Sequence, residues 1–385
     1  MTKASVVIVG GGVMGASAAY HLAARGVRDV VVLDRAASPG AGSTGRATGG
    51  FRAQFSTDVQ VRLSLLAREK LARFESETGV DPGYRPFGYL WLASSEAQRD
   101  DLRRALAVQR AAGLHEAREV SAGEIAALNP AVRLDGVIGG CFCPTDGFVA
   151  PMKILEGYLG AAERLGVRVE WNTTVTALER SGERIVRVVT SNETIEPEQV
   201  IDAAGPWAAP VAALAGVSVP VTPLRRQVAA TTPTTLLPSD MPMTIFAGDG
   251  FHFRVRDGRI LLLYATPGVP GRPFDASVDP EWVAMVTAIA RQRIRGFDAA
   301  EIDPGACHAG LYEMSPDRHA ILGRAPECEN LWLINGSSGH GVMHSPALGQ
   351  LLAEILLDGA ASMDVTSLAP GRFAEQRLNA SSELL

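Results

Sequence analysis

Cysteine and basic charge are both scarce in this 385-residue sequence. Its four cysteines, at positions 141, 143, 307 and 328, form no C-x-x-C pair, so we expect neither a zinc ribbon nor a disulfide framework. Reduced thiols of this kind are typical of a cytoplasmic protein. Basic residues number 36 against 42 acidic ones, which gives a net charge of −6. Because duplex-binding proteins need a basic surface to neutralise phosphates, we expect no nucleic-acid partner.

The sequence also lacks a long uninterrupted apolar run. The stretch 6–24 is apolar, but glycines and serines interrupt it, so we expect no membrane partner. A strand pattern begins at Ser5 after a single lysine, which argues against a signal peptide. Apolar residues make up 46% and charged residues 20%, which excludes a disordered chain. The histidines and acids show no metal-ligand spacing, so we expect no metal.

A dinucleotide-binding pattern opens the chain. The β-branched run 5–9 predicts a buried parallel strand, and the next residues, G-G-G-V-M-G, match G-x-G-x-x-G. A helical pattern over 16–24 and a second strand over 30–33 follow, and the second strand ends at Asp34. This order is that of the β-α-β dinucleotide unit.

Each glycine of the motif has its own role in such a unit. Gly10 allows the tight turn, Gly12 lets the backbone approach a pyrophosphate, and Gly15 lets helix and strand pack closely. The helix N-terminus offers N–H groups to the phosphates. Asp34 can accept hydrogen bonds from ribose hydroxyls and disfavours NADP, but the unit alone leaves NAD and FAD open.

Glycine turns follow two later strands as well. The strand pattern at 199–204 breaks at Gly205, and the strand at 331–335 opens into a glycine-rich loop over 336–341. We expect an amphipathic helix to begin near Pro346, since proline suits a first turn. Other strand and helix patterns lie between these segments. The alternation predicts an α/β fold, with a doubly wound Rossmann-type domain interrupted by a second, strand-rich domain.

Five segments in this order resemble the D-amino-acid oxidase and sarcosine oxidase superfamily of FAD enzymes. They are residues 10–15 with Asp34, 42–52, 203–207, 310–317 and 336–346. The resemblance covers nearly the whole chain. It is strongest to the β-subunits of heterotetrameric sarcosine oxidase and of dye-linked L-proline dehydrogenase.

The resemblance implies a division of the chain and a cofactor, FAD. The FAD domain would comprise residues 1–83, 145–220 and 325–385. The substrate domain, with a mixed or antiparallel sheet, would comprise 84–144 and 221–324. The implied FAD-binding residues are Gly10, Gly12, Val13, Met14, Gly15, Asp34, Arg35, Ser43, Thr44, Arg46, Ala47, Val175, Ala204, Gly205, Trp207, Gly310, Gly339, His340, Gly341, Val342 and Met343.

Five residues are candidates for the substrate side of the site. Arg52 matches the superfamily's arginine that grips a substrate carboxylate, a task that suits a fixed fork of donors. His340 lies in the flavin loop, and Tyr312 follows the pattern of a tyrosine beside the substrate. His252 and Tyr264 lie in the strand-rich domain, and the sequence leaves open whether either points toward the ligand.

Three departures from single-chain sarcosine oxidases qualify the resemblance. Gly310 stands where those enzymes carry a cysteine bonded to flavin, so we expect non-covalent FAD. Met343 replaces a lysine that is a second carboxylate partner, which leaves Arg52 as the expected cation. Leu261 or Leu262 stands in place of a lysine that promotes reaction with oxygen. The electron acceptor, oxygen or an electron carrier, therefore stays open.

The implied function is oxidation of the C–N bond of a small secondary α-amino acid by hydride transfer to flavin, with sarcosine as the first candidate. L-proline dehydrogenase and glycine or D-amino-acid oxidase are alternatives. A non-catalytic FAD-binding assembly factor or partner subunit is a further alternative, but Arg52 favours catalysis. Whether the protein forms a hetero- or homo-oligomer also stays open.

Overall fold

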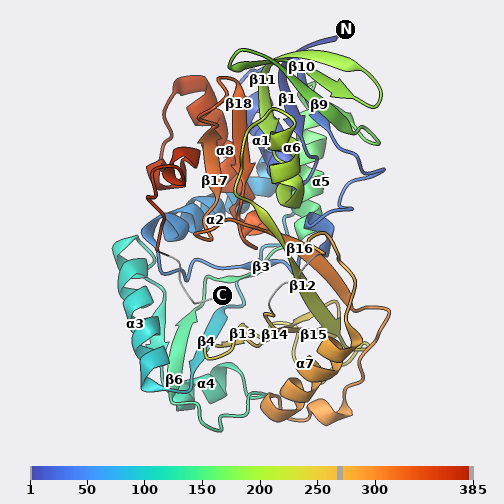
Figure 1. The fold of residues 1–385 in the computed structure, drawn as a ribbon. Helices are drawn as coiled ribbons and strands as arrows, with labels where there is room; N and C mark the ends of the chain where they lie inside the picture. Colours follow the sequence, from blue (N-terminus) through green and yellow to red (C-terminus); the bar gives the residue numbers. More distant parts are fainter. Residues whose placement is uncertain (1, 267–271, 381–385) are drawn as a thin grey trace.

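The computed structural model describes residues 2–266 and 272–380, which form two halves, each built on an eight-stranded sheet (Figure 1). The strands of the first sheet are β1 (Thr2–Val9), β2 (Val30–Leu33), β8 (Arg168–Glu170), β9 (Val175–Ser181), β10 (Arg184–Thr190), β11 (Thr194–Asp202), β17 (Ile321–Arg324) and β18 (Leu331–Asn335). They are ordered β17-β18-β11-β1-β2-β8, and the β9–β10 hairpin joins the sheet at β11.

Strand β1 lies at the centre of the first sheet and is parallel to both β2 and β11. Its alternate side chains enter two different cores, because successive residues of a strand point to opposite faces. Val6 and Ile8 belong to one buried cluster, and Val7 and Val9 belong to another. A strand covered on both faces reads as a continuous apolar run, and this confirms the prediction of a parallel sheet.

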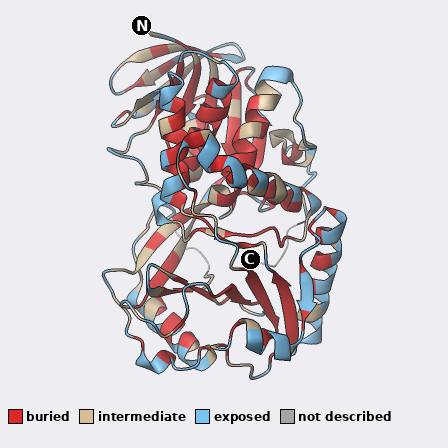
Figure 2. Ribbon diagram, turned by 180° about the vertical axis from the view of Figure 1, so that it is seen from behind, coloured by how far each residue is buried: buried red, intermediate tan, exposed pale blue. Residues whose placement is uncertain are grey.

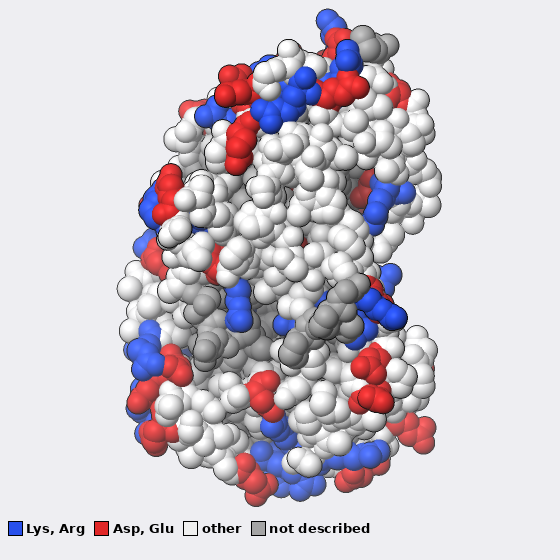
Figure 3. Space-filling view, in the orientation of Figure 1, with Lys and Arg blue, Asp and Glu red and all other residues white. Residues whose placement is uncertain are grey.

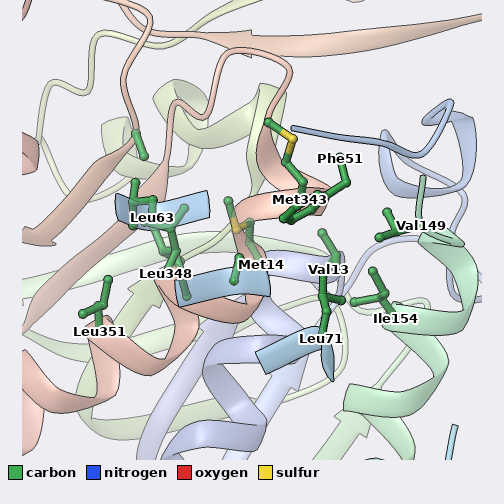
Figure 4. Packing of buried hydrophobic residues seen from close by; sticks show 14 of the residues in the cluster. Val13, Met14, Phe51, Leu63, Leu71, Val149, Ile154, Met343, Leu348 and Leu351 are labelled. Carbon is green, nitrogen blue, oxygen red and sulfur yellow. The ribbon is translucent and has the colours of Figure 1, made fainter. Parts of the chain in front are cut away.

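Four helices pack together on one side of this sheet. They are α1 (Val13–Ala24), α2 (Asp58–Thr78), α5 (Pro151–Arg164) and α8 (Gly341–Asp358). Helix α1 packs against α5 and α8, and Figure 4 shows Val13 and Met14 among side chains of these helices. Helix α6 (Ala208–Ala213) and the β9–β10 hairpin cover the other face.

Helix α8 begins earlier than the sequence predicts. It starts at Gly341 and contains Pro346, so the prediction of a start near Pro346 is wrong. Proline has no N–H to donate to the carbonyl of Val342, four residues before it. The Ser345 hydroxyl donates to that carbonyl instead, at 2.9 Å, which lets the helix continue through the proline.

The second sheet is mixed, as expected. Its strands are β4 (Tyr89–Ala93), β5 (Arg118–Val120), β6 (Gly139–Cys143), β12 (Thr222–Ala230), β13 (Met243–Phe246), β14 (His252–Arg256), β15 (Arg259–Leu263) and β16 (His308–Met314). Strands β4 and β13 are parallel, whereas the other neighbouring pairs are antiparallel. The accompanying helices are α3 (Glu96–Ala111), α4 (Ala122–Leu128) and α7 (Pro280–Arg293).

Alternation in this sheet separates a packed face from a face turned toward the first half. Leu90 and Phe253 pack into a cluster that includes Trp282 of α7. Their neighbours Trp91 and His252 point the other way and line a cavity described below. Figure 2 shows the buried strands of both sheets and the exposed outer side of α3.

One strand lies in the other half from the one expected. Strand β17, at 321–324, pairs with β18 in the first sheet, although the sequence places residues up to 324 in the substrate domain. A buried ion pair holds the segment before it to the C-terminal region: Arg372 Nε lies 2.8 Å from Asp317 Oδ2. We therefore propose a domain boundary before β17, near residue 320.

The surface carries charges of both signs. Figure 3 shows basic and acidic side chains interspersed over one face. Within residues 2–266 and 272–380, no helix is both long and apolar enough to cross a membrane.

Candidate functional site

A cavity of about 1660 Å³ lies between the two halves. Its walls come from the carboxyl ends of β1 and β2, from the glycine-rich loops and from the inner face of the second sheet. In open parallel sheets, ligands bind outside the carboxyl ends of the strands. All 25 residues named as candidates from the sequence line this cavity except Gly15.

The glycines of the first motif differ in what surrounds them. Gly10 has a φ of 113°, and a side chain there would collide with the carbonyl of Ala203. A side chain at Gly15 would collide with the carbonyl of Gly10, so helix and strand approach closely here. At Gly12 an added Cβ would meet only Thr44 Oγ1, at 3.5 Å. The backbone at Gly12 is therefore open to a ligand in the cavity.

The end of β2 and the start of α1 are joined by hydrogen bonds. Asp34 accepts from the backbone N–H of Gly11 at 2.7 Å and from that of Ala36 at 2.8 Å. Gly12, the N-cap residue of α1, has no side chain to cap the helix. The next N–H, that of Val13, donates to Thr44 Oγ1 at 3.2 Å. This carboxylate and helix N-terminus have the arrangement that a ribose and a pyrophosphate require.

The loop after β2 is held from the second half of the molecule. Ser43 Oγ donates to the Leu311 carbonyl at 2.7 Å, and Arg46 donates to the Ala309 carbonyl at 2.9 Å. From β14, Arg256 donates to the carbonyl of Ala47 at 3.0 Å, and Arg254 donates to that of Thr48 at 2.8 Å. The predicted residues Ser43, Arg46 and Ala47 thus hold the loop in place as well as lining the cavity.

Aromatic and small residues line the end of the cavity near β9. The Arg35 guanidinium lies 4.2 Å from the ring of Trp207, and Trp207 stacks on Phe274 with an angle of 9° between the rings. Val175, Ala204 and Gly205 line the cavity here too. These surfaces suit a planar base better than a charged group.

The loop before α8 and the first turn of α8 face another part of the cavity. Gly339, Gly341, Val342 and Met343 line it, and a side chain at Gly339 would collide with the ring of Tyr312. Helix α8 thus points its N-terminus, where the helix dipole is positive, at the space between the halves.

Arg52 is buried at the substrate end of the cavity. Only 5% of the residue is exposed, and Nη2 donates to His340 Nε2 at 3.1 Å. The guanidinium also lies over the rings of Phe55, at 4.4 Å, and Trp91, at 5.2 Å. Burial, followed by the Arg52 charge, lowers the pKa of His340 well below 6.5. The neutral imidazole therefore orients the guanidinium.

The structure shows one supporting acid that the sequence did not single out. Asp146 is fully buried and accepts hydrogen bonds from the Ala53 N–H, at 2.8 Å, and from Gln54 Nε2, at 3.2 Å. Burial raises the pKa of this carboxyl to about 6. Asp146 fixes the segment that carries Arg52, but in the sequence it belongs to an ordinary T-D-G turn.

Further arginines also line the cavity. The methionine at 343 left Arg52 as the expected cation, yet Arg226 of β12 and Arg318 also line the cavity. Arg226 donates to the Thr266 carbonyl at 2.6 Å and lies 5.6 Å from the ring of Tyr312. The sequence alone does not show that Arg226 faces the cavity, because its position follows from the pairing of β12 with β16.

The remaining candidates differ in orientation. His252 lines the cavity, and its Nδ1–H donates to the Gly250 carbonyl at 2.8 Å. Burial lowers the pKa of His252 to about 4, so its ring is neutral. Tyr264 reaches the cavity but packs against the cluster on the outer side of the sheet. Tyr89 and Trp91 were not singled out, yet both line the cavity.

Gly310 lines the cavity, whereas none of the four cysteines is among its described lining residues. Within the described chain, no three His, Cys, Asp or Glu side chains are grouped as a metal site requires. The geometry as a whole fits a dinucleotide at the end of β1 and β2 and a small anion beside Arg52.

Comparison with known proteins shows which family the chain matches. Residues 5–355 match the family described as "FAD dependent oxidoreductase". Glycine oxidase of Geobacillus kaustophilus is 30% identical over 91% of this chain and 92% of its own. Mitochondrial sarcosine dehydrogenase of Mus musculus is 27% identical over 97% of this chain.

A solved structure also matches the fold of this chain over nearly its whole length. L-proline dehydrogenase from P. horikoshii superposes with a TM-score of 0.91 at 26% identity, covering 98% of this chain and 100% of that one. Several curated relatives are longer, and this chain spans only 42% of the mouse sarcosine dehydrogenase.

Proposed function

Because the chain belongs to the family of FAD-dependent oxidoreductases, we propose that it oxidises the C–N bond of a small secondary α-amino acid, with sarcosine as the first candidate. The FAD is bound non-covalently. The family match confirms the expected cofactor and fold class. The substrate rests on the relatives' activities and on the residues around Arg52.

One observation carries the proposal: Arg52 is buried in the cavity with its orientation fixed by His340. A guanidinium presents a planar fork of donors that matches a carboxylate. The low dielectric of a buried site strengthens such a pair. A protein that binds FAD only as a structural group has no need for this arrangement.

The chain's own residues would perform three tasks. Arg52 binds the substrate carboxylate, and the neutral His340 and Asp146 hold Arg52 and its segment in place. The first turn of α8 directs its dipole toward negative charge that develops in the cavity. FAD, when bound, supplies the two-electron acceptor. A substrate amine that arrives neutral needs no side-chain base.

L-proline is the second candidate substrate. The supporting observation is the TM-score of 0.91 with an L-proline dehydrogenase, over nearly the full length of both chains. Glycine is a third candidate, because a glycine oxidase is 30% identical to this chain. The acceptor, oxygen or an electron carrier, remains part of the proposal to be tested.

The test is anaerobic reduction of the bound flavin by sarcosine, L-proline, glycine and D-alanine, followed by admission of air. We expect sarcosine or proline to bleach the visible absorbance fastest, and methylamines without a carboxylate to act poorly. Rapid recolouring in air would indicate an oxidase, whereas slow recolouring would indicate a dehydrogenase. If no amino acid bleached the flavin, a non-catalytic FAD-binding subunit would be the better interpretation.

Acid precipitation tests the mode of flavin attachment. We expect the yellow colour to stay in the supernatant, since Gly310 offers no thiol and no cysteine is among the described cavity-lining residues. Flavin in the pellet would contradict this. We also propose the division of the chain into two domains. Separately, the four free cysteines suggest a cytoplasmic location.

A further inference from the structure

A buried carboxyl group, Glu313 of β16, has an unsatisfied oxygen in the wall of the cavity. The residue is 9% exposed. Its Oε1 accepts from the backbone N–H of Ser337 at 3.2 Å. Its Oε2 is buried and has no hydrogen-bond partner within residues 2–266 and 272–380. Buried polar atoms of this kind are normally satisfied, so the missing partner points to a ligand.

The space around this carboxyl group is kept open by two glycines. A Cβ at Gly205 would lie 3.7 Å from Oε2, and a Cβ at Gly341 would lie 3.6 Å from Oε1. Both glycines line the cavity, one after β11 and the other at the start of α8. The family resemblance implies that the segment at Gly205 would approach the pyrophosphate and ribityl chain of FAD, and that the segment at Gly341 would face the pyrimidine end of the flavin. Glu313 lies between them.

A titratable neighbour of Glu313 is another acid. Asp202, at the end of β11, is fully buried, and its Oδ1 accepts from the Ala204 N–H at 3.0 Å. Repulsion from Glu313 contributes to raising the pKa of Asp202 to about 8, although burial is the main cause. Within the described chain, neither acid has an ion pair with Lys, Arg or His at 4 Å or less.

Among the residues that the structure describes, the other elements packed against Glu313 bring no titrating side chain to it. They contribute Gly205, Met14 of α1, Gly341 of α8, the loop residue Ser337 and, across the sheet, Pro223 of β12. His340 lies just before α8 and His344 lies within it, but burial holds the pKa of each far below neutrality. Near pH 7 and above, the charge at this place therefore depends on the two acids.

An ionised Glu313 would meet FAD unfavourably. FAD brings the negative charges of its pyrophosphate into the same cavity and displaces water from the carboxyl group. Both effects disfavour a carboxylate and favour the neutral acid. A neutral acid also has an O–H, which can donate to an oxygen of the ligand.

We propose that Glu313 is an FAD-binding residue that holds the flavin half of the cofactor through a protonated carboxyl group, so that FAD binding takes up a proton at alkaline pH. The O–H donates to an acceptor oxygen of the ribityl chain or of the pyrimidine ring. This inference concerns the cofactor alone and does not depend on which amino acid is oxidised.

The sign of the pH dependence follows from proton linkage. Burial raises the pKa of Glu313 to about 7 in the protein without cofactor. Below that pH the group already carries its proton, so the Kd for FAD is constant. Above it, each binding event must take up a proton, and the Kd rises by up to about tenfold per pH unit.

The test uses apoprotein and FAD between pH 6 and 9, with flavin fluorescence quenching to measure the Kd. Glu313→Gln keeps a donor but cannot ionise, so its Kd should stay near the wild-type value at pH 6 and remain flat. Glu313→Ala should also be flat but weaker by roughly 2- to 10-fold, the effect of one net hydrogen bond. Circular dichroism and thermal unfolding check that each variant folds.

Asp202→Asn is the matched control. Removing this acid should leave the alkaline rise in Kd in place. Any shift of its onset should be to lower pH, because Glu313 ionises more easily once repulsion from an ionised Asp202 is gone. To separate these effects, calorimetry in two buffers of different ionisation enthalpy counts the protons bound with FAD. Wild type and Asp202→Asn should each take up a proton at pH 9, and Glu313→Gln should take up none.

A wild-type Kd that is flat from pH 6 to 9, or an alkaline rise that persists in Glu313→Gln, would overturn the inference. Apoprotein that bound no FAD at any pH would also overturn it. Failure of every amino acid to bleach the flavin would sink the proposed function instead, and would leave the pH dependence of FAD binding unchanged.

Discussion

The two ends of the cavity are built by different means. At the ends of β1 and β2 the walls are backbone: Gly10, Gly12 and a helix N-terminus, with one carboxylate, Asp34. Beside Arg52 the walls are side chains brought from distant parts of the chain, such as His340 and Trp91. The first end depends on the absence of side chains, and the second depends on their identity.

This difference predicts how each end responds to mutation. A side chain added to a backbone site fills the space of the ligand itself, so binding is lost altogether. A side chain removed from the other end takes away one partner among several, so activity falls in steps. Four substitutions test this contrast, from the largest expected effect to the smallest.

Gly12→Val should abolish FAD retention and leave a soluble, folded protein. The new side chain would project into the open space at Gly12, where the pyrophosphate approaches. The flavin-to-protein absorbance ratio measures the effect. Gly160→Val, in α5 and outside the described cavity lining, is the control and should keep its flavin. Full flavin content in Gly12→Val would show that the phosphates bind elsewhere.

Arg52→Ala should lower kcat/KM for the amino acid by about thirty- to several-thousand-fold. Losing one partner of a buried charge pair costs roughly 2–5 kcal/mol, and 1.4 kcal/mol is about tenfold. Arg52→Lys should restore only part, since an ammonium group lacks the fork. The kcat/KM for an amine without a carboxylate should be nearly unchanged by either substitution. A kcat/KM that stays within about twofold would place the carboxylate site elsewhere.

Asp146→Asn should change how stability depends on pH. Burial raises the pKa of Asp146 from 3.8 to about 6 in the folded protein, so folding favours the protonated form. The stabilisation is fully present below about pH 4 and is lost as pH rises through 6. Relative to Asp146→Asn, the wild type should gain roughly 2–3 kcal/mol in unfolding free energy between pH 7 and pH 4.

Urea denaturation at several pH values measures this difference. Asp240→Asn changes an exposed carboxylate and should follow the wild type. If Asp146→Asn also followed the wild type across this range, Asp146 would not be the buried acid whose ionisation opposes folding.

Arg226→Met should have the smallest effect, a rise in KM of roughly 2- to 10-fold, as expected for one net hydrogen bond. Arg226 already donates to the Thr266 carbonyl, so a substrate anion would share the guanidinium with that carbonyl. Combining Arg226→Met with Arg52→Ala tests whether both arginines bind the same group, because interacting partners give non-additive changes. Additive changes would mean that they act independently.

The same contrast explains what the sequence could predict. Gly10, Gly12 and Asp34 have fixed spacings within one β-α-β unit, so a local pattern finds them. Asp146, Arg226 and Glu313 lie in an ordinary turn and in strands, and their functions come from what folding places beside them. The start of α8 was missed because Ser345 donates to the carbonyl that Pro346 cannot reach, a compensation that helix-start rules do not consider.

The arginines of β14 join the two halves of the molecule. Arg254 and Arg256 belong to the second sheet, but the carbonyls they bind, at Thr48 and Ala47, belong to the loop that follows β2 of the first. The chain also crosses between the halves several times. Neither half can lose its structure without releasing backbone groups that the other half satisfies. Thermal unfolding should therefore be cooperative across the molecule, with one calorimetric transition instead of two.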